Sequence, residues 1–205
     1  MKNDDLLKLN IDFYEKYGKE FSLSRANIWD GMKKIKRYIK DDDKVLDVGC
    51  GNGRIATLFS KDQYTGIDSS SVLLKEAKMK NKDYTFIKKN ILDDNWYIDL
   101  GKYDTVLLIA VLHHIPSRDQ RISLFKNLKK ILSKNGKIIF STWDFDIKDN
   151  MKDLGNRDFL IPFDNKSLRY VHKFSDDEVK EIISVSGFLL SDKICNEANI
   201  YYIIL

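Results

Sequence analysis

Residues 45–53 read Val-Leu-Asp-Val-Gly-Cys-Gly-Asn-Gly, and this stretch predicts the fold around it. Val45, Leu46 and Val48 form a short apolar run typical of a buried strand, and three alternate glycines follow directly. Glycines let the backbone approach a ligand closely, with free amide groups pointing at it. Residues 54–60 then favour the first turns of a helix. A strand, a glycine-rich turn and a helix amino terminus together indicate a site for a nucleotide-like ligand.

The spacing of the glycines separates two classes of ligand. The dinucleotide fingerprint Gly-x-Gly-x-x-Gly would need glycine at position 54, where this chain has Arg54. The chain has Asp-x-Gly-x-Gly-x-Gly instead, with Asp47 placed before the turn. This pattern resembles motif I of the class I S-adenosylmethionine (SAM) methyltransferases, and the resemblance implies SAM as the cofactor. An acid at position 47 suits SAM, which carries an ammonium and a sulfonium rather than a pyrophosphate.

The composition favours a single globular domain over residues 1–205, because 43% of the residues are hydrophobic and no Gly/Ser-rich linker interrupts them. The longest apolar run, Val106–Leu112, is too short to span a bilayer, and Met1–Leu9 lacks the apolar core of a signal peptide. Cys50 and Cys195 have no metal-ligand spacing. We therefore expect a cytoplasmic protein, monomeric apart from functional partners, with no metal site and no membrane contact. The net charge of +4 permits an anionic partner without requiring one.

Strand and helix patterns alternate along the middle of the chain, which predicts an α/β, Rossmann-like fold with a mostly parallel sheet. The resemblance implies seven strands, with a C-terminal antiparallel hairpin. The expected strands are Lys44–Val48, Tyr64–Ile67, Tyr84–Ile87, Thr105–Ala110, Lys137–Ser141, Phe188–Ser191 and Ile200–Leu205. Two helical patterns, Asp5–Lys19 and Ala26–Lys40, form an N-terminal cap over residues 1–43, and residues 146–174 form an insertion on the substrate side. Whether the cap closes over the cofactor is left open by the sequence.

The second strand ends at Asp68, some twenty residues after the glycine turn, where a carboxylate can accept hydrogen bonds from both ribose hydroxyls. The alternative is that Asp68 caps the helix at Val72–Lys80, and the two roles are compatible. The resemblance places the adenine against Asn90 and Ile91, although the family usually has Asp where this chain has Asn90. The predicted cofactor residues are Asp47, Gly49, Cys50, Gly51, Asn52, Gly53, Asp68, Ser69, Asn90, Ile91, Ile109 and Ala110.

Several segments outside the cofactor motif resemble a narrower family. They are Phe21-Ser-Leu-Ser-Arg25 with Trp29, Ala110-Val-Leu-His-His114, Ser141-Thr-Trp143, Asp158-Phe-Leu-Ile-Pro-Phe163 and Arg169-Tyr-Val-His-Lys-Phe174. In this order they resemble the eukaryotic tRNA methyltransferases that esterify the carboxymethyl group of the wobble uridine. The methyltransferase domain fused to an AlkB-like oxygenase shows the same pattern. The resemblance implies tRNA as the substrate and a small zinc-binding activator subunit as a partner.

A carboxylate substrate would attack the SAM methyl without a general base, since it is already ionised at neutral pH. The site then needs cations, and Arg25 and Arg169 suit a carboxylate or phosphate. The three histidines, His113, His114 and His172, all fall in these substrate-side segments. We therefore predict these two arginines and three histidines as the catalytic set. Trp29, Trp143 and Tyr170 are candidates to stack on an unpaired anticodon base.

Each of these residues also has a simpler interpretation. Arg25 can be a surface arginine, one of His113 and His114 can pack beneath the helix that starts at Ser117, and Trp143 can be a lid on the pocket. The basic run Lys33–Lys40 fits a solvated helix face as well as an RNA contact.

Two other functions stay open. One is a small-molecule O- or N-methyltransferase with His113 or His114 as general base. The other is a non-catalytic SAM-binding subunit, against which the intact glycine motif argues.

Overall fold

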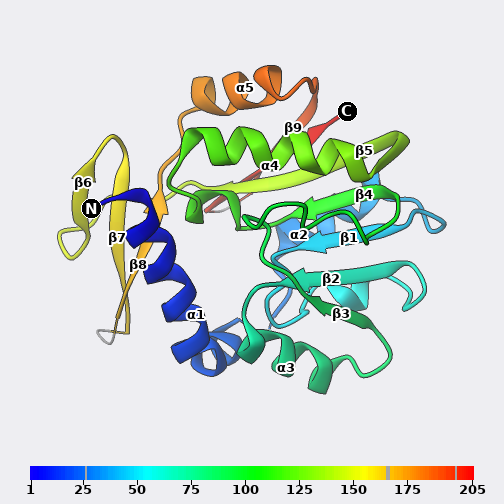
Figure 1. Ribbon diagram of the computed structural model, residues 1–205, viewed down its shortest axis with the longest axis horizontal. Helices are drawn as coiled ribbons and strands as arrows, with labels where there is room; N and C mark the ends of the chain where they lie inside the picture. The colour runs from blue at the N-terminus through cyan, green and yellow to red at the C-terminus, as the bar shows by residue number, and fades with distance from the viewer. Residues whose placement is uncertain (26, 165–166, 197) are drawn as a thin grey trace.

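The computed structural model describes residues 1–25, 27–164, 167–196 and 198–205, and its main feature is a seven-stranded sheet (Figure 1). The strand order is β3-β2-β1-β4-β5-β10-β9. These strands are β1 (Val45–Val48), β2 (Tyr64–Asp68), β3 (Thr85–Lys88), β4 (Tyr103–Leu108), β5 (Leu132–Trp143), β9 (Leu190–Asn196) and β10 (Asn199–Ile204). Strands β1 to β5 pair in parallel, whereas β10 runs antiparallel to both β5 and β9. The predicted Rossmann-like sheet with its C-terminal antiparallel hairpin is confirmed.

Successive residues of the central strands point to opposite faces of the sheet, as strand geometry requires. On one face Val45 and Leu107 are buried with the short helix α2 (Asp30–Ile35) and with α3 (Ser71–Lys80). On the other face Leu46 packs beneath two further helices, α4 (Arg118–Ile131) and α5 (Asp176–Val185). The sheet is therefore covered on both sides, which is why its strands read as almost continuous apolar runs.

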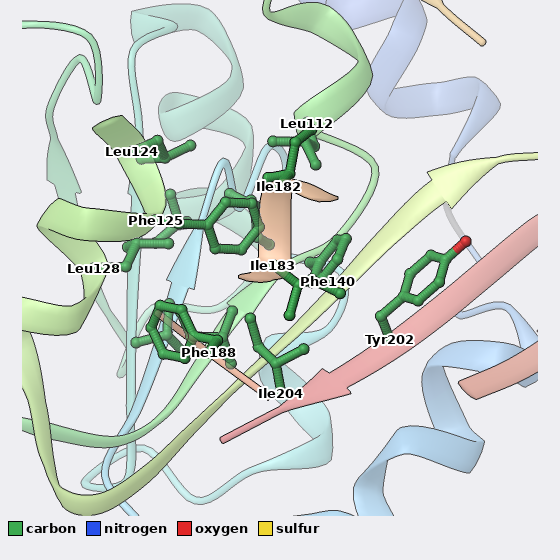
Figure 2. Close-up of a cluster of buried hydrophobic side chains, with 14 of the residues drawn as sticks. Leu112, Leu124, Phe125, Leu128, Phe140, Ile182, Ile183, Phe188, Tyr202 and Ile204 are labelled. Atoms are coloured by element: carbon green, nitrogen blue, oxygen red, sulfur yellow. The ribbon is translucent and has the colours of Figure 1, made fainter. Parts of the chain in front are cut away.

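Aromatic side chains fill the core beneath α4 and α5 (Figure 2). Phe125 of α4 meets Phe140 of β5 edge-on, with ring centroids 5.1 Å apart. Phe140 also stacks on Tyr202 of β10 at 4.9 Å. These contacts join the antiparallel hairpin and α4 to β5, in the parallel part of the sheet.

A second sheet lies beside the first and is separated from it by the long helix α1 (Asn3–Ser24) (Figure 1). Its strands are β6 (Lys152–Gly155), β7 (Asp158–Phe163) and β8 (Ser167–His172), all antiparallel. The predicted insertion at 146–174 thus contains a sheet of its own, although residues 165 and 166 lie outside the described part. Helix α1 packs against both α3 and β8, so it bridges the two sheets.

The prediction of a helix at residues 54–60 is wrong. The segment after the glycine turn holds a single 3₁₀ turn, η2 (Ala56–Leu58), and β2 begins soon after at Tyr64. Residues 54–63 must return the chain to the start of the neighbouring parallel strand, which leaves too few residues for a stable α-helix. A helix amino terminus therefore does not face the ligand here, and the free backbone amides of the turn remain.

The boundaries of several other elements also differ from expectation. The helix expected at Ala26–Lys40 is α2 followed by a 3₁₀ turn, η1 (Lys36–Tyr38), and residue 26 lies outside the described part. Strand β5 begins five residues earlier than predicted, at Leu132, directly after α4. Strand β9 begins later, at Leu190, because Phe188 is first buried against Phe125 of α4. Among the described residues no helix is long and apolar enough to cross a membrane.

Candidate functional site

Three glycines shape the turn after β1. Gly49, Gly51 and Gly53 all have positive φ, at 73°, 55° and 67°. A Cβ on Gly49 would lie 2.3 Å from the Val111 side chain, and one on Gly53 would lie 2.8 Å from the Phe86 ring. Larger residues are therefore excluded by both strain and space. Nothing lies within 4 Å of a Cβ built on Gly51, so this part of the turn is open to a ligand.

The turn opens into a pocket at the carboxyl ends of β1, β2 and β4, which is where open parallel sheets bind ligands. Eleven of the twelve predicted cofactor residues line it, and Gly53 is the exception. They are Asp47, Gly49, Cys50, Gly51, Asn52, Asp68, Ser69, Asn90, Ile91, Ile109 and Ala110. Of the predicted catalytic residues, Arg25 and His114 also line the pocket.

Asp68 is held by the backbone while parts of its carboxylate remain available. Its Oδ2 accepts the Gly51 N–H at 2.8 Å and its Oδ1 accepts the Ser70 N–H at 2.8 Å. The residue that caps α3 is Ser70, whose hydroxyl accepts the Leu73 N–H at 3.2 Å. Asp68 is thus not the cap of α3, and each of its oxygens keeps a lone pair for a ligand hydroxyl. Burial raises the pKa of Asp68 despite these backbone hydrogen bonds.

Two predicted cofactor residues have local partners of their own. The Asn90 side chain accepts the Leu92 N–H at 3.2 Å and donates to Asp93 Oδ1 at 2.6 Å, so its amide closes a turn at the pocket wall. Cys50 is buried, and burial raises the pKa of its thiol well above the usual value. A protonated thiol is a poor nucleophile, which agrees with a packing role for Cys50.

Helix α1 supplies a wall of the pocket that the sequence pattern did not reveal. Asn10, Tyr14 and Phe21 point into it, together with Leu7 and Ile11. The sequence signal for this wall was Asn10, a polar residue at helical spacing from the apolar Leu6 and Phe13. In the structure Asn10 is only 5% exposed. A buried amide on an apolar helix face needs specific partners and so marks a contact with function or architecture.

His114 is neutral and fully engaged by its neighbours. Its Nδ1 lies 3.0 Å from the Tyr170 carbonyl oxygen, which can only accept, so Nδ1 carries the proton. Its Nε2 therefore accepts the Tyr14 hydroxyl at 2.9 Å. Burial, aided by the positive charge of Arg169, lowers the pKa of His114 to about 3. His114 is for this reason unsuited to act as a general base at neutral pH.

His113 lies behind the pocket and not on its wall. The ring is completely buried between His114 and Trp143, with centroids 4.4 Å and 4.5 Å away. Burial lowers its pKa well below the usual value, and neither ring nitrogen has a hydrogen-bond partner in the described part of the chain. The ring contacts of Trp143 with His113 and His114 thus place this indole behind the pocket, as one side of an aromatic wall.

Arg169 is a buried cation enclosed by aromatic rings. Only 4% of it is exposed, and its guanidinium lies over four rings at 5.2 to 5.7 Å from their centroids. The rings are those of Phe13, Phe21, Trp143 and Phe163. The guanidinium donates a hydrogen bond to Tyr14, but its Nε and Nη1 have no partner within the described residues. A buried charge of this kind is costly unless an anion joins it.

Two further arginines stand at the mouth of the pocket. Arg25 is half-buried, packs against the rings of Phe21 and Trp29, and has an unpartnered Nε within the described residues. Its carbonyl accepts the Asn52 side-chain amide at 3.3 Å, which ties it to the glycine turn. Arg54 was not predicted: it stacks on Trp29 at 3.9 Å, and burial lowers its pKa to about 10. In the sequence, Arg54 served only to exclude the dinucleotide fingerprint and was not predicted to line the pocket.

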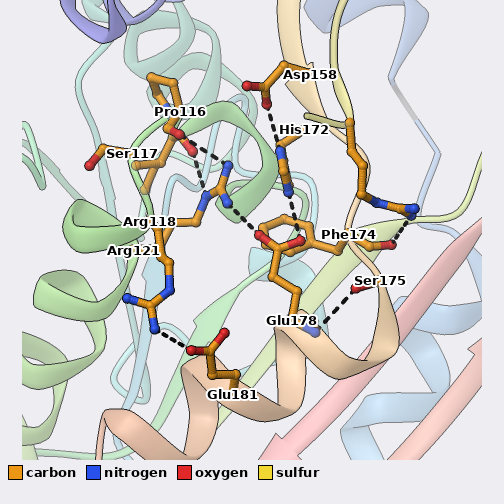
Figure 3. A network of polar contacts seen from close by, with 12 residues as sticks. Pro116, Ser117, Arg118, Arg121, Asp158, His172, Phe174, Ser175, Glu178 and Glu181 are labelled. Atoms are coloured by element: carbon orange, nitrogen blue, oxygen red, sulfur yellow. Dashed lines mark hydrogen bonds and ion pairs between the residues drawn. The ribbon is translucent and has the colours of Figure 1, made fainter. Parts of the chain in front are cut away.

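His172 lies away from the pocket, in a network of charges at the far end of β8 (Figure 3). Its Nδ1 faces Asp158 at 2.6 Å and its Nε2 faces Glu178 at 2.9 Å. Arg121 of α4 donates to the other oxygen of Glu178 at 2.9 Å. The network joins β7 and β8 to α4 and α5. Of the predicted catalytic residues, the structure brings Arg25, His114 and Arg169 together and leaves His172 outside that group.

Comparisons with known proteins show the family and agree with the fold. A family model described as a methyltransferase domain matches residues 23–190, and the chain belongs to the SAM-dependent methyltransferases. The SAH complex of DhpI shares the fold, with a TM-score of 0.74 at 16% identity over 98% of this chain and 96% of that one. The pocket at the glycine turn lies at the carboxyl ends of the parallel strands, where open α/β sheets bind their ligands.

Three similar proteins are methyltransferases by name, and their names give different substrates or none. "Putative methyltransferase ECU09_1500" of Encephalitozoon cuniculi is 27% identical over 94% of this chain and 92% of its own length. The tRNA (carboxymethyluridine(34)-5-O)-methyltransferase of Schizosaccharomyces pombe is 22% identical over 85% of this chain and 86% of its own. The ubiquinone biosynthesis O-methyltransferase of Vibrio campbellii is 29% identical over 68% of this chain and 57% of its own.

Proposed function

We propose that this enzyme methylates tRNA, and that its substrate is the carboxylate of a carboxymethyl wobble uridine. The observation that carries the proposal is Arg169, a buried guanidinium with unpaired N–H groups beside the cofactor pocket. An anionic substrate would supply the missing partner, and a guanidinium can hold a carboxylate through two hydrogen bonds. The similarity to the fission yeast enzyme supports the same substrate class.

The residues around the pocket fit SAM. Asp68 would accept hydrogen bonds from the ribose hydroxyls, Asp47 would face the ammonium group, and Arg54 would face the carboxylate of the methionine part. SAM supplies an electrophilic methyl group on sulfur. The protein holds and orients the attacking carboxylate, excludes water from it, and needs no residue to remove a proton.

The state of the histidines favours this reaction over its small-molecule rival. A hydroxyl substrate would need a base, and the pKa of His114 is about 3 while that of His113 is also lowered by burial. A carboxylate needs none. The rival retains one supporting fact, the similarity to the Vibrio campbellii ubiquinone O-methyltransferase. It predicts a rate that rises with pH through the pKa of the substrate hydroxyl and is insensitive to salt, whereas tRNA methylation should weaken steeply as salt rises.

The test uses purified protein, methyl-labelled SAM and bulk tRNA that carries the carboxymethyl wobble modification. Label that mild alkali releases from the tRNA identifies a methyl ester and supports the proposal. Label that resists alkali would place the methyl on a base or ribose atom and contradict the ester. If the protein binds SAM but labels no tRNA, the assay is repeated with a small zinc-binding activator subunit present. A negative result in that arm too would reject tRNA as the substrate and leave the small-molecule and non-catalytic alternatives.

A further inference from the structure

Asp47, the acid of the glycine motif, has a specific buried partner. The Tyr64 hydroxyl donates to Asp47 Oδ2 at 2.6 Å, and the two side chains come from neighbouring strands, β2 and β1. Asp47 is 2% exposed and Tyr64 1% exposed, yet Asp47 also lines the pocket. One side of the carboxylate is therefore bound to Tyr64, and the other side is directed at the position of the cofactor.

The Tyr64 hydroxyl is held firmly in place. Its ring stacks on Phe59 at 5.9 Å and meets the rings of Tyr84 and Phe86 edge-on. Opposite Asp47 on the neighbouring strand stands Gly66, where a Cβ would lie 2.9 Å from Cys50 Sγ and from the Phe86 ring. The missing side chain at Gly66 therefore leaves room for Cys50 and for the Phe86 ring that packs against Tyr64.

Few other charged or titratable groups act on Asp47. Asp68, at the end of β2, disfavours its ionised form, and Arg54 of the turn favours it. The neighbouring Cys50 is a neutral thiol, because burial raises its pKa well above the usual value. Tyr64 remains a hydrogen-bond donor throughout the neutral range, because burial raises the pKa of its hydroxyl in the same way.

We propose that Tyr64 is a positioning residue for SAM, and that its hydrogen bond keeps Asp47 ionised enough to bind the cofactor at neutral pH. Burial raises the pKa of Asp47 to about 7, even though the Tyr64 hydrogen bond acts to lower it. The ammonium and sulfonium of SAM attract only the ionised form. SAM affinity should therefore fall as the pH drops below neutrality, by up to about tenfold per pH unit.

The experiment measures SAM dissociation constants by calorimetry from about pH 5.5 to about pH 9, where both forms of Asp47 are sampled. The proteins are wild type, Tyr64→Phe, Asp47→Asn and the matched control Tyr84→Phe. Tyr84 is a neighbouring ring whose hydroxyl donates to the Phe59 carbonyl at 2.9 Å and not to the site. Asp47→Asn reports the titration of SAM's own amino group, which has a pKa of about 8.

Tyr64→Phe should move the midpoint of the affinity curve to higher pH and weaken binding about three- to tenfold at pH 7. The difference should vanish at high pH, where Asp47 is ionised with or without the hydroxyl. Tyr84→Phe should follow the wild-type curve. A Tyr64→Phe curve that is weakened equally at every pH would show a packing role only, and an unmoved curve would show no role; either result overturns the proposal. SAM binding is measured without any methyl acceptor, so the outcome is independent of the tRNA proposal.

Discussion

The side-chain amide of Asn10 on α1 forms two hydrogen bonds with the backbone of Tyr170 on β8. Its Oδ1 accepts the Tyr170 N–H at 2.8 Å, and its Nδ2 donates to the Tyr170 carbonyl at 3.0 Å. The same carbonyl receives the Nδ1 proton of His114. One amide side chain thus joins the first helix, the second sheet and the neutral histidine of the pocket.

Replacing Asn10 with Ala should destabilise the protein. The change leaves a buried N–H without its acceptor and weakens the contacts of a buried carbonyl, at a cost of about 1–3 kcal/mol for each group. Thermal unfolding measures the loss. Asn10→Asp keeps the acceptor and loses the donor, so its unfolding temperature should lie between those of Asn10→Ala and the wild type. Equal stability of Asn10→Ala and wild type would show that α1 is docked by other contacts.

Replacing Asp68 with Ala should weaken SAM binding about 10- to 100-fold or more, because the two charge-assisted hydrogen bonds that we propose it accepts from the ribose would be lost. Calorimetric titration with SAM measures the change. Ser70→Ala is the matched control: it removes the cap of α3 at a cost of about 1 kcal/mol in stability and should leave SAM affinity almost unchanged. If the two variants lost affinity equally, the carboxylate would have no role beyond the local turn.

Replacing Asp47 with Asn should stabilise the free protein at neutral pH while weakening SAM binding. The carboxyl pKa is about 7 when folded, against about 4 in an unfolded chain, because burial favours the neutral form. The stability contribution of the neutral form is therefore complete below about pH 4 and is lost as the pH rises towards 7. Asparagine is neutral at every pH and avoids this loss, which is at most about 4 kcal/mol. Unfolding temperatures of the two proteins should agree near pH 4 and diverge by pH 8; parallel curves would contradict the raised pKa.

Replacing His172 with Ala should lower stability and leave SAM affinity intact. The change removes one of the hydrogen-bond partners of Asp158 and of Glu178. Because both carboxylates are partly exposed and keep other partners, the cost is about 1–3 kcal/mol. Burial would raise the pKa of each carboxyl group, but hydrogen bonds from His172 outweigh it and lower both. That stabilisation is present above the unfolded pKa values of about 4 and is lost as the pH falls further. If the His172→Ala variant had normal stability but failed to methylate tRNA, the result would support the predicted role of His172 at the substrate site instead.

The large sheet could be predicted because its strands are buried on both faces and stand out as apolar runs. Asp68 could be located for a related reason, since the end of the second strand fixes its position relative to the glycine turn. The helix at 54–60 was predicted from local pattern alone, and the short return to Tyr64 prevented it. Sequence reasoning has no access to that limit, which depends on where the next strand pairs.

The walls of the pocket were harder to predict than its floor. Tyr14 lies far from the glycine motif in the chain, and only the docking of α1 on β8 brings it to His114. Arg169 and His172 stand three positions apart on one strand, yet Arg169 faces the aromatic rings and His172 faces the carboxylates of the network. Strand alternation predicts that two such side chains point to opposite faces, but not which face meets the pocket.

The most direct test of the account asks whether Arg169 recognises the charge of the substrate. Binding is measured for two anticodon stem-loops that differ only at the wobble uridine, one carrying the carboxymethyl group and the other its neutral amide. Wild-type protein should bind the acid about tenfold to 100-fold more tightly, the value of a charge-assisted pair of about 1.5–3 kcal/mol. Arg169→Gln should bind both stem-loops equally. A wild-type protein that does not distinguish them, or an Arg169→Gln variant that keeps the preference, would contradict the account.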